Sequence, residues 1–145
     1  SEPMSQGTRC HQLALYTILE SPFNMLCDNP SNYMREPESL EFISQIPTVW
    51  DETRVLDGQM GEYIVTARRK GNVWYIGGIT NWTERDVTVD FSFLNNASFR
   101  GVMFKDGVNA HRSARDYTKE ELKTISPVNI HMAPGGGFVM KLVLP

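Results

Sequence analysis

Apolar residues near the start of the chain recur with helical spacing. Three of them and a threonine fall at positions i, i+3, i+4 and i+7: Cys10, Leu13, Ala14 and Thr17. This spacing places them on one face of an α-helix. Ser5 or Thr8 can cap its amino end, and Pro22 ends the pattern because the residue before proline disfavours the helical region. We therefore predict a helix between Thr8 and Glu20.

Two further elements are predicted before residue 47. The apolar run 23–27 ends at Asp28 and Asn29 and is typical of a buried strand with polar residues at the rim of a sheet. A second helix is expected to open with Pro37 in its first turn and to stop at Pro47. Its buried side would be formed by Leu40, Phe42 and Ile43.

From residue 63 the period of the pattern changes from that of a helix to that of a strand. Short runs with alternating or continuous apolar residues are separated by Gly, Pro, Asn and Asp. The predicted strands are 63–68, 73–80, 87–91, 99–105, 122–125, 128–132 and 138–144. Short strands at such spacing predict an antiparallel β-sandwich.

The fold class is therefore mainly β, an antiparallel β-sandwich preceded by a short helix-strand-helix segment. Residues 1–58 carry 3 basic and 9 acidic side chains, whereas residues 59–145 carry 11 basic and 8 acidic ones. This change of charge suggests a domain boundary near Gly58. The first segment is too short to form a domain, and its order of elements matches the last part of a (β/α)8 barrel. We expect the chain to be a piece of a larger protein.

Composition excludes several classes of function. The chain has 145 residues and a net charge of -3, so no basic surface for nucleic acid is expected. No apolar run is long enough for a membrane span, and the first residues do not resemble a secretory signal. The protein is then either cytoplasmic or has a leader outside this chain.

Histidine and cysteine, which bind metal ions in many proteins, are scattered along this sequence. His11, His111 and His131 show no paired spacing, so no metal site is predicted. Cys10 and Cys27 form no metal signature either. They are interpreted as two buried thiols, with a disulfide as the alternative.

Two groups of acidic residues are candidates for chemistry. Asp28 and Asn29 follow the predicted strand 23–27, where they could contact a substrate at the carboxyl end of a barrel strand. The alternative is an Asx turn before a proline. Asp51 and Glu52 are neighbours on an extended segment and point to opposite sides, which favours capping or ion pairing over acid-base catalysis.

Aromatic residues and a glycine run complete the candidates. Trp82 follows a predicted strand and could stack on a sugar ring, although packing in the core or an interface is the favoured interpretation. Trp74 and Tyr75 are adjacent in a strand, so they face opposite sides and at least one is expected in the core. The run 134–137 leads into a strand and lacks the Gly-Lys-Ser/Thr ending of a phosphate loop, which predicts a tight turn.

Several runs together resemble the C-terminal part of glycoside hydrolase family 97. They occur in the order and at the spacing of that family. The runs are 7–16, 20–30, 47–53, 61–65, 67–69, 74–77 and 133–137.

This resemblance implies a bacterial α-glucosidase or α-galactosidase, periplasmic or exported, with an N-terminal β-sandwich, a catalytic (β/α)8 barrel and a C-terminal β-sandwich. Residues 5–46 would form the end of the barrel, and the sandwich from residue 59 would support it and take part in oligomerisation. Members bind Ca2+ near the catalytic centre. Their catalytic and calcium-binding carboxylates lie upstream of this chain, so no catalytic residue and no metal ligand carries over. Asp28 and Asn29 would line the pocket of the intact enzyme.

The resulting expectation is a structural and oligomerisation fragment without catalytic residues. Its partners would be the remaining domains of the parent enzyme, a second copy in a homo-oligomer, and an α-linked oligosaccharide bound by the parent. The alternative is a carbohydrate-binding module that uses Trp82 and Trp74 as its platform.

Overall fold

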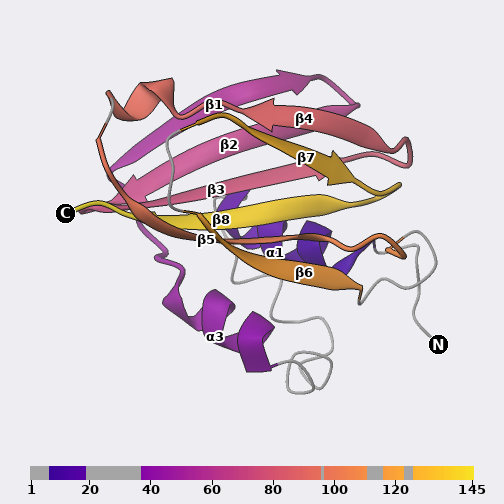
Figure 1. Ribbon diagram of the computed structural model, residues 1–145, viewed down its shortest axis with the longest axis horizontal. Coiled ribbons are helices and arrows are strands. Elements are labelled where there is room, and N and C mark those ends of the chain that lie inside the picture. Colours follow the sequence, from indigo (N-terminus) through magenta and orange to yellow (C-terminus); the bar gives the residue numbers. More distant parts are fainter. Residues whose placement is uncertain (1–6, 19–36, 96, 111–115, 123–125) are drawn as a thin grey trace.

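The computed structural model describes residues 7–18, 37–95, 97–110, 116–122 and 126–145. Two α-helices, α1 (Arg9–Ile18) and α3 (Pro37–Gln45), lie on one face of a large antiparallel sheet (Figure 1). Both match the predicted helices. The predicted strand 23–27, together with Asp28, Asn29 and Cys27, lies outside the described residues.

In the described part of the chain, eight strands form two antiparallel sheets. The larger sheet has the order β1-β2-β3-β8-β5-β6, and β4 pairs with β7 in a second, two-stranded sheet. The strands are β1 (Glu52–Gln59), β2 (Tyr63–Lys70), β3 (Val73–Thr80), β4 (Arg85–Val89), β5 (Arg100–Asp106), β6 (Tyr117–Leu122), β7 (Val128–Met132) and β8 (Gly137–Val143). A 3-10 helix, Ser92–Leu94, follows β4.

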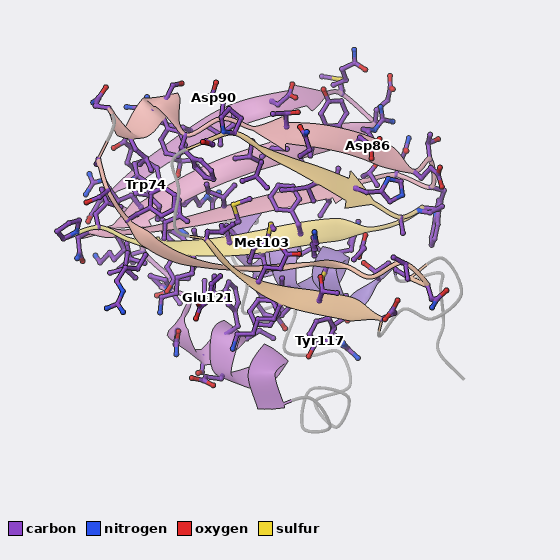
Figure 2. The ribbon with its side chains drawn as sticks, viewed as in Figure 1. Trp74, Asp86, Asp90, Met103, Tyr117 and Glu121 are labelled. Atoms are coloured by element: carbon purple, nitrogen blue, oxygen red, sulfur yellow. The ribbon has the colours of Figure 1, made fainter. Side chains whose placement is uncertain are left out.

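The core of the sandwich lies between the two sheets. β4 and β7 cross the face of the larger sheet that is opposite the helices (Figure 1). Val87 and Ile130 from the small sheet meet Trp74, Met103 and Met140 from the large one, and all of them are buried. Figure 2 shows Trp74 and Met103 between the sheets. The predicted antiparallel sandwich is confirmed.

A second apolar cluster lies on the other face of the large sheet, under the helices. Cys10 and Leu13 of α1 and Phe42 of α3 pack there against Tyr75 and Phe104. The Phe42 ring meets the Tyr75 ring at 5.9 Å and the Phe104 ring at 5.6 Å between centroids, both edge to face. Burial of these aromatic side chains anchors the helices to the sheet.

Trp74 and Tyr75 lie on opposite faces of the large sheet, because successive side chains of a strand point to opposite faces. Trp74 belongs to the inter-sheet core and Tyr75 to the cluster under the helices. Both side chains are buried, so Trp74 is unavailable as a sugar platform. The predicted use of Trp74 as a sugar platform was therefore wrong. β3 is a central strand with other elements packed on both faces of the sheet, so its successive side chains are buried.

Two strands differ from the sequence pattern. β1 (Glu52–Gln59) was not predicted, because its side chains are exposed or half-buried and the register shifts at a bulge between Val55 and Asp57. The large sheet therefore begins before Gly58. β6 occupies Tyr117–Leu122, earlier than the predicted 122–125, whose last three residues lie outside the described ones. Edge strands carry polar side chains on both faces, which hides the alternation.

Candidate functional site

The turn between β7 and β8 joins helix α1 to the sandwich. Asp106, at the end of β5, accepts hydrogen bonds through Oδ2 from the N–H of Ala133 at 2.9 Å and of Gly137 at 3.0 Å. On the helix side, the Thr8 N–H donates to the carbonyl of Gly135 at 3.0 Å. The turn is thus held from both sides, which confirms a structural turn here.

Glycines are required in this turn because other groups approach it closely. Gly135 has φ +64, and a Cβ there would lie 2.5 Å from the Trp82 ring. A Cβ on Gly136 would lie 2.0 Å from Oδ2 of Asp106. Any side chain at either position would displace the neighbouring group.

The Asp106 carboxylate is unusual because it is almost fully buried. Burial raises its pKa from 3.8 to about 6, and hydrogen bonds from the Thr8 side chain and from the two turn amides oppose that rise. The desolvation cost of the charged form exceeds the gain from these donors. The protonation state of the Asp106 carboxyl therefore affects the turn between β7 and β8, which contacts the start of α1.

Helix α1 begins directly on this turn. The Thr8 hydroxyl caps the helix by accepting the His11 N–H at 3.1 Å, as predicted for one of the two candidate caps. The His11 ring approaches the Gly136 carbonyl through Nδ1 at 3.1 Å, so this nitrogen carries the proton. Burial lowers the pKa of His11 and favours its neutral form.

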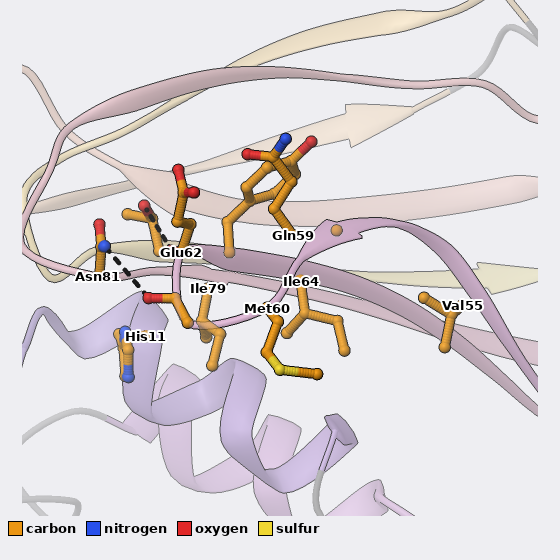
Figure 3. Close-up of a pocket in the computed structure, with 12 residues that line it drawn as sticks. His11, Val55, Gln59, Met60, Glu62, Ile64, Ile79 and Asn81 are labelled. Carbon is orange, nitrogen blue, oxygen red and sulfur yellow. Dashed lines mark hydrogen bonds between the residues drawn. The ribbon is translucent and has the colours of Figure 1, made fainter.

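An apolar groove runs beside α1, above β1 and β2. Its volume is about 500 Å³, and its lining includes His11 on the helix and Val55, Met60, Ile64 and Ile79 on the sheet. In Figure 3 these apolar side chains point to the side of the sheet on which α1 lies, whereas Gln59 and Glu62 point to the opposite side. The groove is therefore a continuation of the face that the helices cover.

Trp82 lies on the surface next to the same turn. It follows β3, is 55% exposed, and packs one part of its ring against Gly135. Its partly exposed ring is the remaining aromatic group that could contact a sugar. It is separate from Asp28 and Asn29, which the described residues do not include.

The acidic pair Asp51 and Glu52 forms ion pairs, as the extended geometry predicted. Asp51 accepts the Gly71 N–H at 2.8 Å and lies 3.7 Å from the Lys70 ammonium. Glu52 pairs with Arg54 and Arg69 on β1 and β2. These donors lower the pKa of both carboxyls, which stay ionised.

Within the described part of the chain, no group of three or more His, Cys, Asp or Glu residues is placed to hold a metal ion. The same residues contain no helix that is both long enough and apolar enough to cross a membrane.

Sequence reasoning missed Asp106 and the groove. Asp106 reads as part of a polar Asp-Gly turn, and only the approach of residue 133 shows that it is buried. The groove depends on β1, which lacks a strand pattern. The glycine run 135–137 was the one available signal, since three glycines in a turn indicate crowding by neighbours.

The fold and the junction define a β-sandwich domain that carries helices on one face. A family model described as glycosyl-hydrolase 97 C-terminal, oligomerisation, matches residues 49–143, and the chain therefore belongs to glycoside hydrolase family 97. A retaining α-galactosidase of Bacteroides thetaiotaomicron is 67% identical over 144 residues, which are 98% of this chain and 22% of that enzyme. A probable retaining α-galactosidase of Streptomyces bingchenggensis is 40% identical over 67 residues, or 46% of this chain and 11% of that protein.

Solved structures show the same fold. A family 97 enzyme in complex with acarbose, from a Pseudoalteromonas species, superposes with a TM-score of 0.84 at 33% identity, over 97% of this chain and 23% of that one. A β-arabinopyranosidase superposes with a TM-score of 0.70 at 27% identity, over 94% of this chain and 21% of that one. The chain thus spans less than a quarter of each relative.

Proposed function

We propose that this chain is the C-terminal structural and oligomerisation domain of a retaining α-galactosidase. The 67% identity to a retaining α-galactosidase over 98% of the chain carries this proposal. The family model, with its description as an oligomerisation domain, supports the same role. The parent enzyme would hydrolyse α-linked galactosides and would act in the breakdown of oligosaccharides.

Catalysis would reside outside this chain. Retaining glycosidases place two carboxyl groups about 5–5.5 Å apart on either side of the scissile bond. Glu62 is the acidic residue among the described residues that line the groove beside α1, but its side chain points to the opposite side of the sheet and pairs with Arg85 at 3.6 Å (Figure 3). Asp51 and Glu52 are both engaged by basic side chains on a sheet edge. None of these residues offers a pair of opposed carboxyls around a sugar-sized space.

Hydrolysis of p-nitrophenyl α-galactoside tests this assignment. The purified chain is expected to release no nitrophenol above a blank, whereas the intact enzyme should turn the substrate over and prefer it to the α-glucoside. Tryptophan fluorescence of the chain provides the folding control, because Trp74 is buried in the core. Turnover by the chain alone would contradict the structural role. Preference of the intact enzyme for the α-glucoside would contradict the substrate assignment.

Self-association is the second measurable part of the proposal. Light scattering should show the intact enzyme as an oligomer, and the purified chain should retain part of that association. A monomeric intact enzyme over the accessible concentration range would contradict an oligomerisation role.

The exposed ring of Trp82 supports one second candidate, a carbohydrate contact. Trp82 is 55% exposed and is held in place by Gly135, so a sugar could stack on its free surface. Titration of the chain with galactosides or starch fragments should then show saturable binding that Trp82→Ala abolishes. Absence of binding in the wild-type chain would leave only the structural role.

Location and metal content follow the parent enzyme in this proposal. We expect a periplasmic or exported enzyme, which fractionation of the source bacterium would test. We also expect the intact enzyme to contain Ca2+, as the resemblance to family 97 implies. Metal analysis of the intact enzyme and of the chain would locate it.

A further inference from the structure

Among the residues that the structure describes, no element covers one apolar strip of the large sheet. It consists of Val55 on β1, Met60 in the turn after β1, Ile64 on β2 and Ile79 on β3. Val55 is 66% exposed, and the Met60 side chain is fully exposed. An apolar strip with an adjacent groove of about 500 Å³ indicates a surface that is covered in the complete protein.

The strip lies one helix width from α1. Helix α1 crosses β3 at Gly77, where a Cβ would meet the Ala14 carbonyl at 3.1 Å, and crosses β8 at Gly137, where a Cβ would meet Cα of His11 at 2.9 Å. The β1–β2 pair lies two strand spacings from the β3–β8 pair, a distance of roughly 10 Å. Neighbouring helices pack about 8–10 Å apart, so the free space matches one further helix in the same layer.

The walls of the groove favour a helix over an added strand. One wall is α1 itself, through His11, and the floor is the sheet. Strand addition at β1 is opposed by the bulge after Val55 and by the charges of Arg54 and Asp57. A helix laid on the strip would contact α1 on one side and the apolar side chains below it, as α3 does on the other side of α1.

The polypeptide that could supply this helix precedes α1. The chain corresponds to 22% of the retaining α-galactosidase that it resembles, and the matching family model describes a C-terminal region. The first described residues lie at the Gly135 turn, where the Thr8 N–H donates to the carbonyl of Gly135, at the end of α1 that adjoins the groove. We propose that a helix from the upstream part of the parent enzyme docks on the strip formed by Val55, Met60, Ile64 and Ile79. This inference rests on the proposed function, since it requires a longer parent chain.

Oxidation of Met60 in the intact wild-type enzyme tests the inference without any substitution. Met103, Met132 and Met140 are fully buried, so Met60 is the exposed methionine among the described residues. Peroxide treatment followed by mass spectrometry of the tryptic peptide between Arg54 and Arg68 gives its rate of oxidation. A Val108→Met variant provides the matched reference, because Val108 is 90% exposed and does not line the groove.

We expect Met60 to oxidise at least about tenfold more slowly than the methionine of Val108→Met, at every enzyme concentration. Equal rates would overturn the proposal, because the strip would then be free. Protection that disappears on dilution, together with a fall in mass to the monomer, would also overturn it and would assign the strip to a second copy.

Introducing a charge into the strip provides a second test of the proposal. Met60→Glu in the intact enzyme should lower Tm by about 2–4 °C without changing the mass measured by light scattering, whereas Val108→Glu should leave both unchanged. Dissociation of an oligomer by Met60→Glu would overturn the proposal in favour of a second copy. Hydrolysis of the α-galactoside is measured separately, so an incorrect substrate assignment would be recognised independently of the state of Met60.

Discussion

Replacing Asp106 with asparagine is expected to remove a pH dependence that is built into the sandwich. The wild-type carboxyl has a pKa of about 6 in the folded chain, against 3.8 for the unperturbed group. At pH values between these two, the folded state holds a proton that the unfolded state has released. Stability therefore falls as the pH rises through this window. Asparagine has no proton to exchange there.

The magnitude follows from the two pKa values. One pH unit of difference corresponds to about 1.36 kcal/mol, so the rise from 3.8 to about 6 corresponds to about 3 kcal/mol. This stabilisation is present below about pH 4, decreases up to about pH 6, and is absent above that value. The asparagine carbonyl can still accept the N–H groups of Ala133 and Gly137, so the turn keeps its acceptor.

The assay is urea unfolding of the chain followed by tryptophan fluorescence at intervals from pH 4 to pH 8. The wild type, Asp106→Asn and Asp90→Asn are compared, since Asp90 is an exposed aspartate directly after β4 (Figure 2). Every other titratable side chain is the same in the three proteins, so the difference between the curves isolates the substituted residue. Asp106→Asn should gain stability relative to the wild type as the pH rises, by about 3 kcal/mol in total.

The result that refutes this reasoning is a parallel pair of curves for the wild type and Asp106→Asn across the whole range. Such a result would mean that the pKa of the carboxyl is the same in the folded and the unfolded state. The turn amides and the Thr8 hydroxyl would then offset the cost of burial.

Three further substitutions test the packing of the domain, each by its unfolding free energy in urea. Gly135→Ala should cost at least about 1–2 kcal/mol, because alanine is strained at φ +64 and its Cβ would meet the Trp82 ring; Trp82→Ala in the same chain should recover part of the loss, and full additivity would refute the contact. Phe138→Ala should cost about 3–5 kcal/mol, since this side chain is fully buried between the sheets; a cost near that of an exposed site would contradict its place in the core. Phe42→Ala should cost about 3 kcal/mol and speed amide hydrogen exchange in α3; unchanged exchange would show that α3 does not depend on this aromatic anchor.

The elements with strong local patterns were predictable from sequence. The four residues predicted to line one side of α1 are all fully buried, and Thr8 caps the helix. Pro37 and Pro47 bracket α3 because proline suits a helix start and excludes a helix interior. The central strands were found because burial of one or both faces imposes an apolar period.

The candidate site was only partly predictable. Trp82 follows β3 as predicted. Its ring is 55% exposed, so it is not packed in the core, and its packing in an interface stays a prediction. Asp106 and the groove arise from contacts between segments far apart in the chain, such as Asp106 with Ala133 and His11 with Gly136. Such a contact cannot be predicted from a local pattern, because the residues on either side of each partner show no feature that indicates it.

Periodicity, proline positions and extended similarity were sufficient to predict the β-sandwich class, the two helices and the family, because they are local or additive properties of the chain. Which polar group is buried and which apolar surface is exposed could be seen only in the folded chain. Burial depends on which distant parts of the chain pack against a residue. Asp106 is therefore shielded from solvent, whereas Met60 is exposed to it. The same physical reason leaves Val55 and Met60 exposed, because no described element packs against them.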